Sequence, residues 1–217
     1  NHSDLIAFDM GGTTAKICII EDGTPSRVGT FEVGHVYRFA RGSGLPIRAP
    51  VLEMIEIGAG GGSVAQVSAL GLLKVGPESS GAEPGPACYR RGGNAATVTD
   101  ADLYLGYLDQ DFFLGGGMVL DQSRAEAAIE KDVAVPLGLT VERAAAGINS
   151  VVNDNMARAA KVHCLERGRD PREYTMVAFG GAGPVHAYNV AMELGISRIL
   201  FPARAGVMSA FGFLVSP

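Results

Sequence analysis

The segment DMGGTTAK, residues 9 to 16, places an acid, two adjacent glycines, two threonines and a lysine within a short stretch. Adjacent glycines let backbone N–H groups approach an anion, while threonine hydroxyls and a lysine ammonium group add donors and positive charge. These residue types predict a loop that binds phosphate. An ordinary glycine hairpin turn with a surface aspartate is the alternative for this segment taken alone. The candidate phosphate ligands are Gly11, Gly12, Thr13, Thr14 and Lys16.

Asp9 opens this segment directly after the apolar run from Leu5 to Phe8. That run predicts a buried strand, which would place the Asp9 carboxylate at the strand end beside the loop. Carboxylate oxygens are the ligands that hard cations prefer. We therefore expect Asp9 to hold Mg2+ or a metal-bound water beside the phosphates, and we count it as a candidate catalytic residue and metal ligand.

A second glycine segment lies within YTMVAFGGAGPVHAYNVAMELG. Met176 to Phe179 read as a buried strand, a glycine turn follows, and Pro184 suits the first turn of a helix that ends before Gly195. A strand that leads through glycines into a helix start presents N–H groups and a positive dipole end to an anion or nucleotide. A packing turn without a ligand is the alternative. The candidate nucleotide ligands are Gly180, Gly181 and Gly183.

Other nucleotide motifs fit less well. No GxxxxGK[ST] pattern occurs, which argues against a P-loop. Gly58 to Ser63 imitates GxGxxG but ends in serine and precedes no long amphipathic helix, so it supports a dinucleotide fold only weakly.

Two further carboxylates, Glu53 and Glu56, precede the triple glycine and are candidate catalytic residues. Their spacing of three puts them on opposite faces of a strand, so only one can point into a site. Solvent-facing or ion-paired strand positions are the alternative for both. Asp100 is more simply a helix cap than a catalytic carboxylate, and His163 is more simply a core or surface histidine than a catalytic base. His186 lies one turn into the helix after the second glycine segment, either near a nucleotide or packed against the sheet.

The elements that must position these residues fall into unlike halves. Residues 4–33 predict three strands with a hairpin at Asp22-Gly23, and residues 34–99 predict few helices. Asp121 or Ser123 can start a helix that ends near Val135. From Thr140 to about Arg167, apolar residues recur at steps of three and four. That stripe predicts one long helix and consists of Val141, Ala145, Ile148, Val152, Met156, Ala159 and Val162.

Composition narrows the function classes. The 217 residues are 47% hydrophobic and 19% charged, with a net charge of −5, which indicates a globular fold without a broad basic surface. We therefore expect no nucleic-acid partner. No apolar stretch is long enough to span a membrane, and no signal peptide is visible. The number of cysteines is odd, so we expect Cys18, Cys88 and Cys164 to be reduced thiols. This agrees with the expectation of a cytoplasmic protein.

Taken together, the motifs DMGGTTAK, IGAGGGSVA, SSGAEPGPACYRRGG, TVTDADLYLG, ERGRDPREYTMVAFGGAGPVHA and RAGVMSAFG resemble the hydantoinase A / 5-oxoprolinase family over nearly the whole chain. That family includes ATP-dependent N-methylhydantoinase A subunits, 5-oxoprolinases and subunits of acetone and acetophenone carboxylases. The resemblance implies an α/β, actin-like ATPase fold built of ribonuclease-H-like halves. Since one DxGGT turn is present, at Asp9, we expect a fragment of a longer chain that binds ATP weakly or not at all alone.

The resemblance also implies a division of the chain and a role for each glycine segment. Residues 1–33 and 140–217 would form the ribonuclease-H-like nucleotide-binding part, and 34–139 an inserted Gly/Pro-rich β segment followed by helices. DMGGTTAK would be the second phosphate loop and AFGGAG the adenosine loop. Some members carry an acid-x-His metal pattern near Glu53, where this chain has Ile55.

The activity implied is phosphorylation of a carbonyl oxygen by ATP with Mg2+. A hydantoin-type or 5-oxoproline-type cyclic amide would then be opened by hydrolysis. A ketone carboxylase subunit and a non-catalytic nucleotide-binding module remain alternatives. The implied partners are a small cyclic amide or ketone and a hydantoinase B-like subunit or domain, with no membrane partner.

Overall fold

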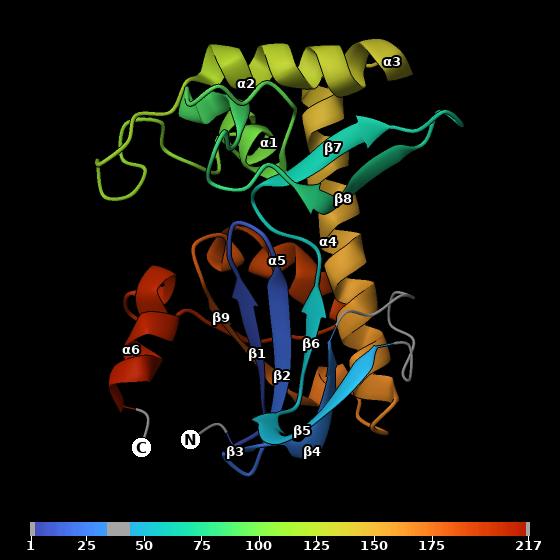
Figure 1. The fold of residues 1–217 in the computed structure, drawn as a ribbon, viewed down its shortest axis with the longest axis vertical. Helices are drawn as coiled ribbons and strands as arrows, with labels where there is room; N and C mark the ends of the chain where they lie inside the picture. The colour runs from blue at the N-terminus through green and yellow to red at the C-terminus, as the bar shows by residue number, and fades with distance from the viewer. Residues whose placement is uncertain (1–2, 34–43, 216–217) are drawn as a thin grey trace.

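A mixed six-stranded sheet forms the centre of the computed structural model, which describes residues 3–33 and 44–215 (Figure 1). Its strands are β1 (Leu5–Met10), β2 (Ala15–Glu21), β3 (Thr24–Pro25), β6 (Met54–Ile57), β9 (Thr175–Phe179) and β10 (Ile199–Leu200). The order is β10-β9-β1-β2-β3, with β6 also paired to β2. β2 runs antiparallel to β1 and β6, whereas β9 and β10 run parallel to β1. The structure confirms an α/β fold.

Alternation along the strands determines which sheet face is buried. Ile6, Phe8 and Met10 of β1 are fully buried, and the residues between them are half-buried. The buried face packs against two helices, α4 (Val141–Leu165) and α5 (Gly183–Leu194). Burying one apolar face of a sheet is the main stabilising contribution in such a layer.

The long helix α4 confirms the prediction from its apolar stripe. Thr140 caps its start by accepting a hydrogen bond from the Arg143 N–H, and Gly168 follows its end with a φ of 66°. The prediction is wrong for the last residue of the apolar stripe, because Val162 is 49% exposed and the neighbouring His163 is buried instead. A strict step of three or four drifts around a helix with 3.6 residues per turn, which explains this late error.

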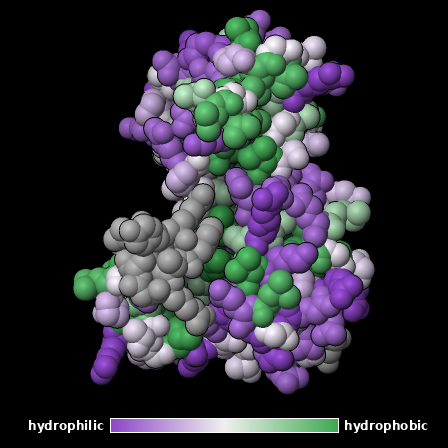
Figure 2. Space-filling model, turned by 90° about the vertical axis from the view of Figure 1, so that its right-hand side faces the viewer, coloured by the Kyte–Doolittle hydropathy of each residue, from purple (hydrophilic) through white to green (hydrophobic). Residues whose placement is uncertain are grey.

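A second group of elements lies beyond one end of the sheet, and we call residues 63–139 the upper lobe (Figure 1). α4 spans both the upper lobe and the sheet, and Figure 2 shows the outline narrowing between them. The helices α2 and α3 are joined by a π-helical turn over Glu130–Ala134. The lobe contains β7 (Ser63–Val67), β8 (Leu73–Ser79), a 3-10 turn (Ala87–Tyr89), α1 (Val98–Tyr104), α2 (Gln122–Ile129) and α3 (Val135–Leu137).

Helix starts in the upper lobe correct one prediction and confirm another. Thr97, not Asp100, is the N-cap of α1. Asp100 stands three residues later and closes a capping box, because its carboxylate accepts from the Thr97 N–H while the Thr97 hydroxyl accepts from the Asp100 N–H. Asp121 caps α2 as predicted.

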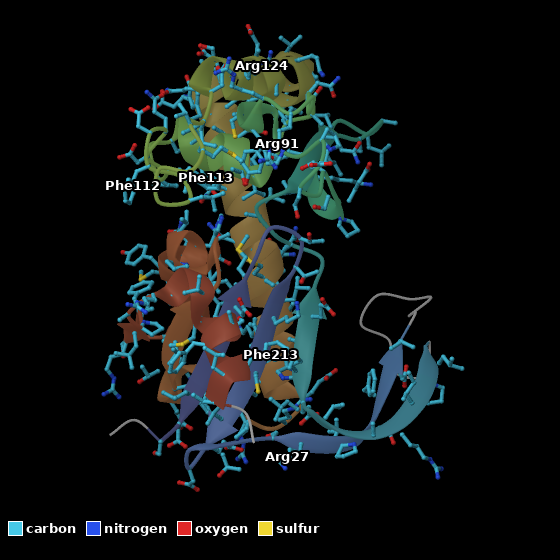
Figure 3. All side chains as sticks on the ribbon, turned by 60° about the vertical axis from the view of Figure 1, so that its left-hand side comes forward. Arg27, Arg91, Phe112, Phe113, Arg124 and Phe213 are labelled. Atoms are coloured by element: carbon cyan, nitrogen blue, oxygen red, sulfur yellow. The ribbon has the colours of Figure 1, made fainter. Side chains whose placement is uncertain are left out.

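Two peripheral elements complete the described chain. β4 (Arg27–Val33) and β5 (Leu45–Leu52) form a separate two-stranded ribbon, which Figure 3 shows extending from the lower end of the sheet. A 3-10 turn (Ala205–Val207) leads into α6 (Met208–Val215), whose Phe213 is exposed. Within residues 3–33 and 44–215, no helix combines the length and apolar character needed to cross a membrane.

Candidate functional site

The two predicted glycine segments meet at one end of the sheet. β1 and β9 are parallel neighbours with Asp9 opposite Phe179, so the two segments that follow these strands leave the sheet side by side. The Ala182 N–H donates to the Met10 carbonyl at 2.9 Å. Gly180 has a φ of 86°, and a Cβ there would collide with an Asp9 carboxylate oxygen and the Met10 carbonyl. Only glycine allows this close approach, which brings the two segments together at the end of the sheet.

A third glycine segment joins them, and the sequence reasoning missed its role. The Gly61 N–H donates to the Gly11 carbonyl at 3.0 Å, and the Gly62 N–H donates to the Gly12 carbonyl at 2.6 Å. A Cβ on Gly60 would lie 2.6 Å from the Thr13 nitrogen. The triple glycine is therefore a backbone support for the DMGGTTAK loop. Strand β7 follows the triple glycine directly, where a dinucleotide-binding fold would have a helix. The structure therefore excludes a dinucleotide-binding motif at this segment.

Hydroxyl residues attach the upper lobe to this support. Thr99, at the start of α1, donates to the Gly61 carbonyl from its backbone N–H at 2.7 Å and from its hydroxyl at 2.8 Å. The Ser80 N–H donates to the Gly62 carbonyl at 2.8 Å. The upper lobe and the sheet thus share one junction at the glycine loops.

A row of charged residues crosses the sheet next to the loop. In the strand register, Asp9 of β1 lies directly opposite Lys16 of β2, and Lys16 lies directly opposite Glu56 of β6. Directly paired residues point to the same face, so these side chains lie on the face opposite the packed helices. The Lys16 ammonium group donates to the Thr14 hydroxyl at 2.8 Å and lies 3.3 Å from Glu56 Oε1. Its positive charge is therefore held at the edge of the loop.

Glu53 is not part of this row. It lies on the other side of the strand and forms an ion pair with Arg167, just beyond the end of α4. The prediction that the two glutamates lie on opposite faces is confirmed, and the one on the loop side is Glu56. The structure does not bring Glu53 to the glycine loops.

Asp9 itself is half-buried at the meeting point of the loops. The Ser209 hydroxyl, from the start of α6, donates to Asp9 Oδ2 at 2.9 Å. In the part of the chain that the structure describes, no group of three His, Cys, Asp or Glu residues forms a metal cage. A single carboxylate still fits Mg2+, which is held in many nucleotide sites by one or two carboxylates, phosphates and water. The serine within RAGVMSAFG is the only advance signal for Ser209.

The start of α5 differs from the other long helix starts. Thr97, Asp121 and Thr140 cap α1, α2 and α4 with side-chain oxygens. Among the described residues no side chain caps α5, whose N-cap is Ala182. The Ala182 N–H donates to Met10 and the Val185 N–H to the Ala182 carbonyl, which leaves the N–H of Gly183 and the positive dipole end of α5 at the glycine junction without a side-chain acceptor.

Tyr89 brings an aromatic side chain from the SSGAEPGPACYRRGG motif toward the same junction. Its phenol interacts with the Thr99 hydroxyl, and its ring lies 5.5 Å from that of Phe113. Burial is the main cause that raises the pKa of Tyr89, so the phenol stays protonated at neutral pH.

The chain belongs to the hydantoinase/oxoprolinase family, whose model matches residues 1–217. It is 45% identical over its whole length to the uncharacterized protein MJ0964 of Methanocaldococcus jannaschii, of which it covers 32%. It is 40% identical over 98% of its length to the caprolactamase subunit alpha of Pseudomonas jessenii, of which it covers 29%.

Two solved structures agree with the fold. One, the nucleotide-free structure of acetone carboxylase, from work on the mechanism of ATP-dependent acetone carboxylation, matches 97% of this chain with a TM-score of 0.84 and 32% identity. The other, the ATP-dependent caprolactamase from Pseudomonas jessenii, matches the whole chain with a TM-score of 0.83 and 38% identity. The chain covers 29% and 30% of those chains, so it spans less than a third of the proteins it matches.

Proposed function

We propose that this chain carries the ATP-binding part of an enzyme that phosphorylates the carbonyl oxygen of a cyclic amide before the ring is opened by hydrolysis. The observation that carries the proposal is the junction of the segments Gly11–Gly12, Gly60–Gly62 and Gly180–Gly183 at the uncapped start of α5. Such a junction presents backbone N–H groups and a helix dipole to a polyanion.

We further propose an actin-like arrangement. The antiparallel strands β1, β2 and β6 followed by the parallel strands β9 and β10 give the sheet order expected of one ribonuclease-H-like half. Residues 1–33 and 140–217, together with β6, would form the nucleotide-binding part. The remainder of 34–139 would be an insertion that includes the upper lobe.

The residues present support distinct tasks. The Gly12 N–H and the hydroxyls of Thr13 and Thr14 would orient phosphates, with Lys16 supplying charge at the loop edge. The Gly11 N–H donates to the Thr14 carbonyl at 3.0 Å, so Gly11 would line the site by shaping the turn. Asp9 would hold Mg2+, which neutralises charge on phosphate oxygens when bound. Gly180, Gly181 and Gly183 would accommodate the adenosine side. Because Glu53 pairs with Arg167 on the other face, we assign it a structural role, and we retain Asp9 and Glu56 as the carboxylates nearest the chemistry.

The cyclic-amide assignment is supported by the name of the caprolactamase relative, since caprolactam is a cyclic amide. An amide carbon is a weak electrophile with a poor leaving group, and transfer of the γ-phosphoryl group to the carbonyl oxygen makes the carbon open to attack by water. A ketone carboxylase is the second candidate, supported by the acetone carboxylase structure. A hydantoinase B-like partner would complete either enzyme.

The test uses the full-length protein that contains this chain, purified with its B-like partner. ATP hydrolysis is measured with hydantoin, 5-oxoproline, a lactam or acetone present in turn. We expect stimulation by a cyclic amide with ring-opened product in proportion to ADP. Stimulation by acetone with bicarbonate would favour the carboxylase candidate, and no stimulation by any of them would leave only a nucleotide-binding module.

A further inference from the structure

A buried polar cluster lies where α1, α4 and α5 meet, away from any ligand contact described above. His186 of α5 is 0% exposed, Asp102 of α1 is 2% exposed, and Asn149 and Asn153 of α4 are 5% and 1% exposed. Burying four polar side chains is costly unless each is hydrogen-bonded. Their bonding pattern therefore carries information.

The hydrogen bonds form a closed chain of fixed direction. Asn149 Nδ2 donates to Asp102 Oδ1 at 2.9 Å, and Asn153 Nδ2 donates to Asn149 Oδ1 at 2.8 Å. The Asn153 carbonyl oxygen is then left facing His186 Nδ1 at 2.8 Å. His186 Nε2 lies 3.1 Å from Asp102 Oδ2. Both ring nitrogens of His186 therefore face side-chain oxygens.

The direction of these bonds fixes one end of the histidine ring. The Asn153 amide nitrogen is used on Asn149, so its carbonyl oxygen accepts from the His186 Nδ1–H. One proton joins the His186 Nε2 to the Asp102 carboxyl group. The two asparagines and the histidine–aspartate pair therefore satisfy one another within the buried cluster.

The position of this pair relates it to the glycine junction. His186 lies three residues after Gly183, in the first turn of the helix that begins at the AFGGAG loop. Asp102 lies three residues after Thr99, in the second turn of the short helix whose first turn holds the Gly61 carbonyl. The pair therefore joins two helices that each contact a different glycine loop.

We propose that the Asp102–His186 pair, supported by Asn149 and Asn153, is a positioning device that holds the AFGGAG loop and the triple-glycine loop at a fixed separation for nucleotide binding. This inference rests on the proposed ATP site. The pair touches no ligand and acts through the two helices. The upper lobe then contributes to nucleotide affinity from a distance.

The test measures the Kd for ATP and the thermal midpoint of the full-length protein with its partner. Asp102→Asn is the matched conservative variant, because the introduced amide can donate to His186 Nε2 while its carbonyl still accepts from Asn149. We expect this variant to bind ATP within about threefold of the wild type. His186→Asn keeps a donor for Asn153 but leaves the buried Asp102 carboxyl group without its histidine partner. We expect it to raise the Kd at least about tenfold.

A stability control separates positioning from general loosening. Ile19→Ala makes a cavity on β2, toward the sheet end opposite the loops, and is expected to lower the midpoint without changing the Kd for ATP. Wild-type affinity in His186→Asn would overturn the proposal. Equal loss of affinity in Ile19→Ala and His186→Asn would also overturn it, because the effect would then report stability alone.

One readout is independent of ATP and of folding of the His186 variant. Nitrogen-15 NMR of histidine-labelled wild type should show a hydrogen-bonded Nδ1–H on His186, and Asp102→Asn should shift the Nε2 signal while keeping the Nδ1–H. An Nδ1 without a proton in the wild type would overturn the inference. If the wild type binds no ATP while the Nδ1–H is present, the proposed function fails instead, and the positioning role fails with it while the hydrogen-bonded pair stands.

Discussion

Asp9 and Asp100 are both aspartates beside glycine-rich segments, yet their surroundings differ. Asp100 is 0% exposed, and its carboxylate accepts from the N–H groups of Ala87, Cys88 and Thr97 at 3.3, 2.8 and 3.0 Å and from the Thr97 hydroxyl at 2.7 Å. Asp9 is half-buried beside three glycine loops and accepts from Ser209. A carboxylate surrounded by donors of its own protein is structural, while one facing an open junction can serve a ligand.

The helix starts beside these residues differ in the same way. α1 is closed by a capping box between Thr97 and Asp100, whereas α5 begins at Ala182 without a side-chain cap. The N–H groups at the start of α1 are used within the protein. At the start of α5 Pro184 has no N–H and the Val185 N–H donates to the Ala182 carbonyl at 3.1 Å, so in the described chain the N–H groups of Gly181 and Gly183 are the ones left for a ligand. The contrast teaches that an acid, a glycine and a helix start make a ligand site only where the protein leaves the donors unused.

The largest expected effect tests the structural side of this contrast. Asp100→Ala leaves buried N–H and O–H donors without an acceptor, and we expect a loss of about 3 to 5 kcal/mol in the free energy of unfolding. Asp100→Asn, which retains one oxygen, should lose less. Urea unfolding of the full-length protein measures both. Asp109→Asn, at an exposed position in the same lobe, should change stability by less than about 0.5 kcal/mol.

The functional side is tested by Asp9→Ala. We expect turnover to fall by about 100-fold, with a smaller change in the KM of the organic substrate, because charge beside the transferring phosphoryl group matters most in the transition state. Steady-state kinetics with ATP and a cyclic amide measure this split. Unchanged turnover would remove Asp9 from the site, and a rise in KM alone would make it a binding residue.

Glycine substitutions sharpen the contrast between packed and open loop positions. A Cβ on Gly60 would press on the Gly12 and Thr13 backbone at 2.6 Å, so Gly60→Ala should cost about 2 kcal/mol of stability and weaken ATP binding. No atom lies within 4 Å of a Cβ on Gly181. Gly181→Ala should therefore keep wild-type stability and still weaken ATP binding about tenfold, since the methyl enters space left for the ligand. Gly29→Ala, at an open position on β4, is the control and should change neither quantity.

The smallest effect concerns alkaline pH and involves neither aspartate region. Burial raises the pKa of the Cys164 thiol from 9.0 to about 11, with Arg167 opposing and Asp170 adding to the shift. The folded state thus holds this proton more tightly, so its contribution is complete below pH 9 and is lost as pH rises through 11. We expect a loss of about 1 kcal/mol between pH 9 and 11, after allowing for solvent screening. Urea unfolding at both values should show a smaller loss in Cys164→Ala, and an identical loss would contradict the assignment.

Local patterns predicted most of the elements. The apolar stripe predicted α4, the strand-glycine-proline order predicted β9 and α5, and Asp22-Gly23 predicted the turn after β2. These signals are local, because each depends on periodicity or on turn chemistry within a few residues. Errors arose where a distant contact decides, as at Asp100, whose carboxylate is used by Ala87 and Cys88 as well as by Thr97.

The amino-acid sequence by itself determined the strands within residues 4–33, strand β9, the long helix, the two glycine turns at Asp9 and Gly180, and the family. Only the tertiary structure decided that the triple glycine supports the first loop, that Ser209 reaches Asp9, and that Glu56 rather than Glu53 shares its face. The physical reason is that strand pairing and helix packing join residues far apart in the chain. Their partners are set by hydrogen bonds and close backbone approach, which no local pattern encodes.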